Sequence, residues 1–180
     1  MQKNIKITSI LAAVTAATVI AATAQASDGV ITFNGAITAT TCSIATGGNG
    51  SFTVNLPTVQ TTAFSGPGKT AGNTGFTIDL ANCTPNSGNV RAFFEMGPTV
   101  DTTTNGLLNS NGTATNVEVQ LLDNSNAVIA VGADAQDSGP FAIGADGSAH
   151  LVYSAQYLST NGVPTAGSVS TTVTYSLNYN

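Results

Sequence analysis

Charged residues are scarce in this chain, and basic residues are the scarcest. Four lysines and arginines stand against nine aspartates and glutamates among 180 residues. Lys3 and Lys6 lie at the very start, so beyond residue 26 only Lys69 and Arg91 oppose the nine acidic residues, which gives a net charge of −7. Proteins that bind nucleic acid need clustered Lys and Arg to neutralise phosphates. The composition therefore excludes nucleic acid as a partner.

Residue types that carry catalysis or bind metals are also few. The chain has no G-x-S-x-G nucleophile motif, and its one histidine, His150, alternates with Val152 as a strand residue would. Two cysteines and one histidine lack the close spacing of a zinc site. Asp134, Asp137 and Asp146 lack the regular ligand order of a calcium-binding loop. We therefore predict no enzyme activity, no cofactor and no metal.

The longest apolar run lies at the N-terminus. Two lysines precede the run at residues 10–22, and two overlapping A-x-A patterns end at Ala24 and Ala26. These features predict a secretory signal peptide over residues 1–26, cleaved after Ala24 or Ala26. The run contains two threonines and is shorter than the ~20 apolar residues that a membrane span needs. Cleavage after Ala26 leaves 154 residues, enough for one domain with a sizeable core.

The two cysteines, Cys42 and Cys83, both follow the predicted signal peptide. An even number of cysteines in an exported chain favours a disulfide. Two free buried thiols are the alternative.

The pattern of the chain beyond the signal peptide is all-β. Gly, Asn, Ser and Pro clusters that suit turns separate β-rich or alternating segments. These segments are residues 51–56, 75–80, 90–96, 116–122, 127–131, 150–158 and 168–179. Seven or eight short strands with one disulfide predict a two-sheet, immunoglobulin-like sandwich.

A strand pattern opens the exported chain in "SDGVITFNGAITATTC", residues 27–42. Ile31, Phe33 and Ile37 alternate on one side with Gly35 between them, so one face requires a hydrophobic core. No turn signal precedes this segment, so no earlier strand can pair with it as a hairpin.

A second strand pattern closes the chain in "TTVTYSLNYN". Val173, Tyr175, Leu177 and Tyr179 share one face, and the pattern continues almost to the C-terminus. Pairing of the first and last strands within one molecule is one arrangement that the sequence allows.

Several motifs together resemble a known family. They are the signal peptide, "GVITFNGAITATTC" before the first cysteine, "FTIDLANC" at the second, "TNVEVQLLD", and the ending "AGSVSTTVTYSLNYN" with its penultimate tyrosine, Tyr179, and with Gly167 fourteenth from the end. In this order and spacing the chain resembles a major pilin of the chaperone–usher pathway, similar to the subunits of type 1 and F17-like fimbriae. The motifs cover nearly all of the exported chain.

The resemblance implies an incomplete immunoglobulin-like sandwich that lacks its last strand and is completed by donor-strand exchange. Residues 27–41 would be an N-terminal extension that donates a strand through Ile31, Phe33, Gly35 and Ile37, and residues 42–180 would form the pilin domain. The acceptor groove, which also binds the chaperone, would lie along the final strand. Its implied residues are Gly167, Val173, Tyr175, Leu177, Tyr179 and Asn180.

The resemblance also implies partners and a location. The partners would be identical or related subunits, a periplasmic chaperone and an outer-membrane usher. The resemblance also allows a host-surface receptor as a partner. The chain would be exported through the periplasm into an extracellular fimbria used in adhesion. A minor tip-proximal subunit and a secreted glycan-binding β-sandwich module are the alternatives that remain open.

Overall fold

The computed structural model describes residues 32, 35, 37 and 39–180. The chain divides into two units, Met1–Ala36 and Ile37–Asn180, and every strand described below belongs to the second. The predicted signal peptide, Ile31 and Phe33 lie outside the described residues. Among the described residues no helix is long and apolar enough to cross a membrane.

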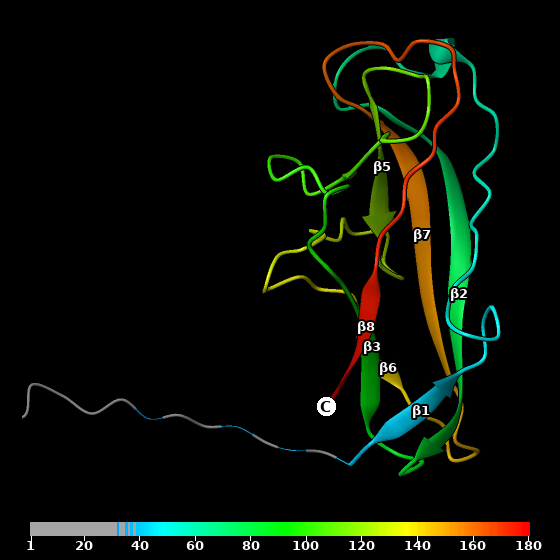
Figure 1. The fold of residues 1–180 in the computed structure, drawn as a ribbon, viewed down its shortest axis with the longest axis vertical. Helices are drawn as coiled ribbons and strands as arrows, with labels where there is room; N and C mark the ends of the chain where they lie inside the picture. The colour runs from blue at the N-terminus through cyan, green and yellow to red at the C-terminus, as the bar shows by residue number, and fades with distance from the viewer. Residues whose placement is uncertain (1–31, 33–34, 36, 38) are drawn as a thin grey trace, which may run out of the picture. The chain divides into compact units, whose positions relative to one another are not determined.

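Two antiparallel sheets form the second unit (Figure 1). One has the order β1-β2-β7-β5-β4 and the other β6-β3-β8, and a single 3-10 turn, η1 (Thr61–Ala63), interrupts the coil after β1. The strands are β1 (Thr41–Ile44), β2 (Thr70–Thr84), β3 (Asn89–Phe94), β4 (Leu107–Leu108), β5 (Val117–Leu122), β6 (Phe141–Ala142), β7 (Ala149–Ser159) and β8 (Tyr175–Tyr179).

The longest pairing joins β2 to β7, from Thr70 opposite Leu158 to Leu80 opposite Ala149. Thr, Ile, Leu and Phe alternate along β2 and suit a pleated surface with one buried face. The register shifts between Ala71 and Thr74, where Gly72 has a φ of +70°. Glycine accommodates this left-handed conformation without a steric cost, so the strand bends there without ending.

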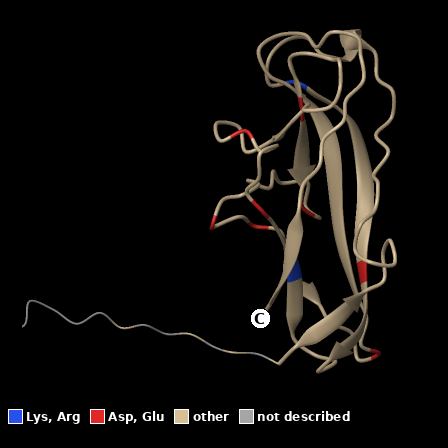
Figure 2. Cartoon of the chain, in the orientation of Figure 1, with Lys and Arg blue, Asp and Glu red and all other residues tan. Residues whose placement is uncertain are grey.

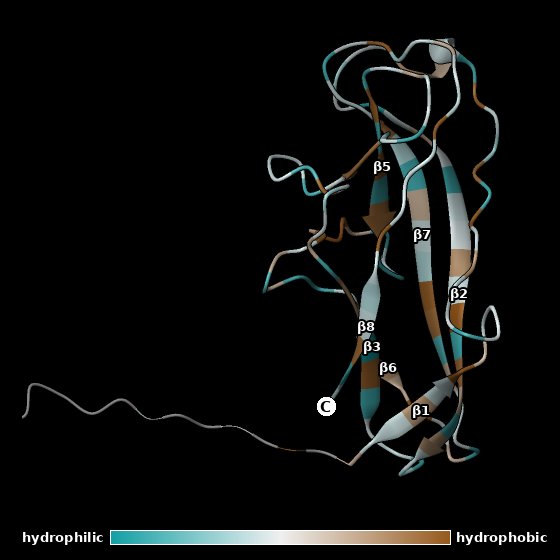
Figure 3. Ribbon diagram, in the orientation of Figure 1, coloured by the Kyte–Doolittle hydropathy of each residue, from teal (hydrophilic) through white to brown (hydrophobic). Residues whose placement is uncertain are grey.

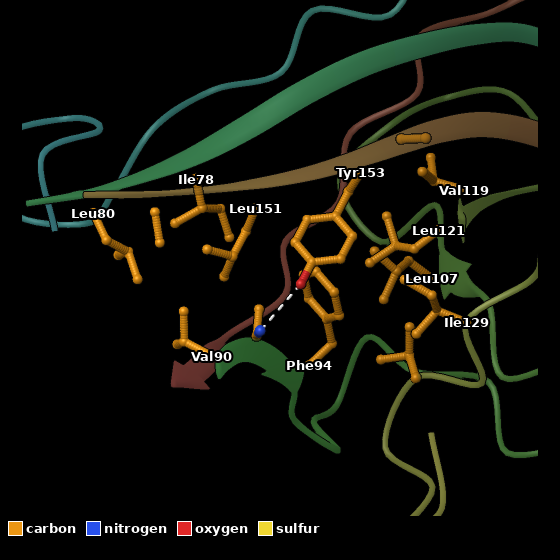
Figure 4. Packing of buried hydrophobic residues seen from close by; sticks show 14 of the residues in the cluster. Ile78, Leu80, Val90, Phe94, Leu107, Val119, Leu121, Ile129, Leu151 and Tyr153 are labelled. Atoms are coloured by element: carbon orange, nitrogen blue, oxygen red, sulfur yellow. Dashed lines mark hydrogen bonds between the residues drawn. The ribbon is translucent and has the colours of Figure 1, made fainter. Parts of the chain in front are cut away.

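A core of apolar side chains fills the space between the sheets (Figure 4). Ile78 on β2, Leu151 on β7 and Val90 on β3 are completely buried, and Figure 3 shows brown, apolar segments along the same strands. Tyr153 brings its hydroxyl into this core, where it accepts a hydrogen bond from the Ala92 amide (3.0 Å) and donates one to the Ser138 carbonyl (2.7 Å). Burial raises the pKa of Tyr153 to about 12, so the hydroxyl stays protonated and keeps both bonds.

The predicted disulfide is present between Cys42 on β1 and Cys83 on β2. It crosslinks β1, an edge strand of the larger sheet, to its neighbour β2. In the chain-entropy model, closing a loop of this length stabilises the fold by about 4 kcal/mol.

We therefore expect the Cys42→Ala/Cys83→Ala double variant to lose about 4 kcal/mol of unfolding free energy, measured by urea denaturation. Thr41→Ala, an exposed neighbour on the same strand, serves as the control and should change little. A loss of less than about 1 kcal/mol in the double variant would show that β1 is held by other contacts.

The all-β prediction is confirmed, with a difference at three segments. Predicted strands at residues 75–80, 90–96, 116–122 and 150–158 coincide with β2, β3, β5 and β7. Residues 127–131 form only a bridge, between Val128 and Leu122. Residues 51–56 form no strand, and of residues 168–179 only β8 does. The short strands β1, β4 and β6 were not predicted.

Candidate binding groove

The second unit, Ile37–Asn180, contains a groove of about 760 Å³ that opens onto the hydrophobic core. It runs between a segment that follows β1 and the segment that leads into β8, which Figure 1 shows in cyan and in orange to red. We call residues 49–56 the N-terminal wall and residues 169–175 the C-terminal wall. The rest of the lining is Ile44, Phe76, Ile78, Phe94, Leu107, Val119, Leu121, Ala155 and Tyr157.

The floor of the groove is apolar, whereas its two walls also carry uncharged polar residues. Its floor is made by core residues that include Ile78, Phe94 and Leu121, so a side chain that entered the groove would contact the core directly. Of the described residues that line it, none is charged, and the acidic and basic residues in Figure 2 lie mostly on loops. Exposure of such an apolar floor to water is unfavourable, which favours association with a partner that covers it.

The C-terminal wall offers unpaired backbone groups to the groove. The carbonyl oxygens of residues 168, 170, 172 and 174 accept hydrogen bonds from the Ala114 amide, the Asn111 amide, the Thr99 hydroxyl and the Glu95 amide. Val169, Thr171 and Val173 make no backbone hydrogen bond with any described residue. Alternate residues of an extended chain direct their N–H and C=O groups to opposite edges. One edge of this wall is therefore satisfied, and the other is free to pair.

The N-terminal wall is unpaired as well. Between residues 52 and 59 the backbone makes no hydrogen bond to any residue that the structure describes. Val54 and Leu56 are half-buried toward the groove, while Thr53 and Asn55 are exposed. The segment thus has the alternation of a β-strand without a neighbouring strand.

A side-chain cluster fixes the start of the C-terminal wall. Asn109 donates from Nδ2 to the Ala114 carbonyl (2.8 Å) and the Ser168 carbonyl (3.1 Å), and its Oδ1 accepts from the Ser170 amide (2.8 Å). Gly167 passes so close to this loop that a Cβ there would lie 2.5 Å from the Ala114 nitrogen. The family resemblance gave Gly167 only as part of a motif. The close approach to the loop explains why a residue without a side chain is needed at this position.

One hydroxyl in the C-terminal wall is buried without a partner. The Oγ1 of Thr171 has no hydrogen bond to any described residue. An unpaired buried hydroxyl costs about 1–3 kcal/mol.

Thr171→Val keeps the shape of the side chain and removes this cost. We expect it to raise the unfolding free energy by about 1 kcal/mol in thermal or urea denaturation. Thr172→Val, on the exposed side of the same wall, should change it far less. A destabilised Thr171→Val variant would mean that the hydroxyl is satisfied in solution.

The structure brings together only part of the predicted acceptor set. Val173 and Tyr175 line the groove. Leu177 and Tyr179 continue along β8, paired with Ala92 and Val90 of β3, and lie outside the lining. Asn180 extends this ladder through its backbone bonds to Asn89.

Two of the predicted donor residues are described. Ile37 is fully exposed, and a Cβ built on Gly35 would meet nothing within 4 Å.

One contact across the groove was not predicted. The Tyr175 hydroxyl donates to the Gly50 carbonyl (2.9 Å), so it joins the two walls. Gly50 lies in a turn cluster, which gives no hint of this contact. Residues 51–56 of the N-terminal wall were predicted as a strand, and their alternating pattern is the signal that could have placed them beside the groove.

Outside the groove, polar side chains form small surface pairs. His150 Nδ1 lies 2.7 Å from an Asp79 carboxylate oxygen on the neighbouring strand, and both residues are exposed. Asp146 accepts hydrogen bonds from the Ser148 amide and hydroxyl, which lower its pKa. Within the described part of the chain, no three His, Cys, Asp or Glu side chains gather as a metal site would require.

A sequence model of the family described as "Type-1 fimbrial protein, A" matches residues 56–180. The chain belongs to the type-1 fimbrial protein family. The match includes the C-terminal wall, β8 and the floor of the groove. The protein is therefore a structural subunit of an extracellular surface filament built from such subunits.

Relatives of known name agree with this assignment. The fimbrial subunit is 44% identical over 164 residues to the major fimbrial subunit SMF-1 of Stenotrophomonas maltophilia, covering 87% of this chain and 95% of that protein. It is 42% identical to the F17 fimbrial protein of Escherichia coli over 99% of both chains. The resemblance to F17-like pilins is thus confirmed.

A solved structure supports the fold. The antigen and type I fimbria protein of Burkholderia pseudomallei shares 29% sequence identity with this subunit, with a TM-score of 0.51 over 77% of this chain and 88% of that one. The immunoglobulin-like, all-β prediction is confirmed.

Proposed function

We propose that residues 31–37 of one subunit fill the groove of another, as a strand between the two walls, and that this contact builds the filament. The observation that carries the proposal is the pair of unpaired backbone edges, at residues 52–59 and at Val169, Thr171 and Val173. A single extended segment placed between these edges would form hydrogen bonds with both. It would also cover the apolar floor.

The dimensions of the donor and the groove agree. The C-terminal wall, residues 169–175, is about 20 Å long at ~3.3 Å per residue, and residues 31–37 have the same number of residues. Ile31, Phe33, Gly35 and Ile37 give four inward positions. Burying each of the three large side chains contributes roughly 1.5–3 kcal/mol before ordering costs. The full exposure of Ile37 in a single subunit fits a side chain whose core lies in a neighbour.

Polymerisation follows from this topology. The donor is a segment near the N-terminus and the groove lies in the domain, so the contact joins two different surfaces. Heterologous contacts of this kind propagate into open filaments unless they close into rings. In this account residues 1–26 are removed on export, residues 27–41 form the donor extension and residues 42–180 form the pilin domain.

The groove also calls for a temporary partner before assembly. An uncovered apolar groove with two free strand edges would aggregate. We infer that a periplasmic chaperone lends a strand to the groove, with Asn180 at the end of β8 as its anchoring point, and that an outer-membrane usher transfers the subunit to the fibre. The role of the subunit is structural, without catalysis or a cofactor.

A peptide-rescue experiment tests the proposal. Residues 27–180 and a shorter protein that lacks residues 27–38 are refolded with and without a peptide of residues 27–38. We expect the shorter protein to need the peptide for stable folding and to remain a monomer with it. A shorter protein that is a stable monomer and ignores the peptide would contradict the proposal and favour a self-complete secreted binding module.

A further inference from the structure

The N-terminal wall has one long-range hydrogen bond among the described residues. The Gly50 carbonyl accepts from the Tyr175 hydroxyl at 2.9 Å. From residue 52 to residue 59 no backbone hydrogen bond anchors the segment to the rest of the described chain. The next backbone hydrogen bond is local to η1, where the Gln60 carbonyl accepts from the Ala63 amide. The position of the wall therefore depends on the contact at Gly50.

The Gly50 end of the wall is shaped for this one contact. Gly50 has a φ of +83°, and a Cβ there would lie 3.1 Å from Ile44 Cδ1 and 3.3 Å from the Tyr175 oxygen. Glycine therefore lets the carbonyl approach the hydroxyl without strain. Tyr175 is itself fixed, because it opens β8 opposite Phe94 and its ring packs against the core. The hydroxyl thus connects a firmly held strand to a loosely held wall.

We propose that Tyr175 is a positioning residue that holds the N-terminal wall at strand-pairing distance from the C-terminal wall, ready for residues 31–37 of a second copy. The inference rests on the proposed function, since a positioned wall matters only if a strand enters. Without the tether, the wall must be ordered at the moment of donor entry. That ordering cost lowers the rate of productive entry.

Two other tyrosines provide matched controls for a Tyr175→Phe variant. Tyr157 lines the same groove, and its hydroxyl makes no hydrogen bond with any described residue. Tyr179 accepts a hydrogen bond from the Cys42 amide (3.2 Å) but lies outside the groove lining. Tyr157→Phe removes a hydroxyl that lies in the groove but makes no hydrogen bond. Tyr179→Phe removes a hydroxyl that is hydrogen-bonded to β1 and not to the N-terminal wall.

The test uses residues 27–180, refolded as wild type and as each variant. Cleavage within residues 51–59 by a nonspecific protease is followed by mass spectrometry, with cleavage within β2 and β7 as reference, and filament growth is followed by light scattering. Tyr175→Phe should speed cleavage within residues 51–59 by about 3–10-fold and slow growth by a similar factor, as expected for one lost hydrogen bond. Tyr157→Phe and Tyr179→Phe should stay within about twofold of wild type in cleavage of the wall.

The outcomes separate the two proposals. Unchanged cleavage of the wall in Tyr175→Phe would overturn the positioning role, and so would faster cleavage with unchanged growth. If no protein forms filaments, including wild type, the proposed donor contact fails. The rate of cleavage within residues 51–59 then tests the Tyr175 tether by itself.

Discussion

A subunit with Phe33→Asp should not extend a filament. The substitution removes a buried aromatic side chain worth roughly 1.5–3 kcal/mol and introduces a carboxylate into a groove without a charged lining residue, at a further cost of several kcal/mol. A combined loss of about 4 kcal/mol corresponds to a contact about 10³-fold weaker. Size-exclusion chromatography and electron microscopy of refolded residues 27–180 should therefore show monomers and short aggregates but no filaments.

The neighbouring position provides the control. Asn34→Asp adds the same charge on the opposite face of the donor segment, where alternation places it toward solvent. This variant should polymerise normally. The groove of the Phe33→Asp subunit is unaltered, so the chaperone complex that we infer should form with this variant as with wild type. Normal filaments from Phe33→Asp together with a block by Asn34→Asp would mean that the register is shifted by one residue.

An equimolar mixture of Phe33→Asp and Val173→Asp subunits should give dimers and nothing longer. Val173 lines the groove, so Val173→Asp removes a working acceptor but leaves the donor intact. The donor of the Val173→Asp subunit can enter the groove of the Phe33→Asp subunit. The remaining donor and groove of that pair are both defective, so growth stops after one contact.

Mass photometry of the mixture and of each variant alone measures this result. Each variant alone should remain monomeric. Thr174→Asp, on the exposed side of the C-terminal wall, is the control for an added charge and should still polymerise with itself. If Val173→Asp fails to fold, Val169→Asp provides the same defect at another lining position. Long filaments in the mixture would contradict a contact between one donor and one groove.

The sequence predicted correctly the segments that pair with a neighbouring strand. It also predicted strands at segments that have no neighbouring strand in the structure. Residues 75–80 and 150–158 have an alternating pattern and form β2 and β7, because each finds the other as a partner. Residues 51–56 have the same kind of pattern yet form no strand. An alternating pattern indicates which side chains become buried. A β-strand in a sheet also requires the backbone of a neighbouring strand to hydrogen-bond with. Failed strand predictions on both sides of the groove are what a missing strand should produce.

Other features could not be read from the sequence for physical reasons. The strands β4 and β6 have two residues each, too short to show a period. The bond between Tyr175 and Gly50 joins residues 125 positions apart, and local patterns carry no information at that range. For the same reason the prediction of a groove came from the family resemblance. The groove lining contains Val173 and Tyr175, and Leu177 and Tyr179 continue along β8.

Amide hydrogen exchange at single residues of the C-terminal wall tests the donor-strand account most directly. The domain lacking residues 27–38 is refolded with the peptide of those residues, and exchange at the amides of this wall is measured in the complex. If the groove takes a strand, the amides of Val169, Thr171 and Val173, which have no hydrogen bond within the described part of the subunit, should be protected to an extent similar to the Ser170 amide, which is bonded to Asn109. Peptide binding that leaves the amides of Thr171 and Val173 exchanging freely would place the peptide elsewhere and contradict the account.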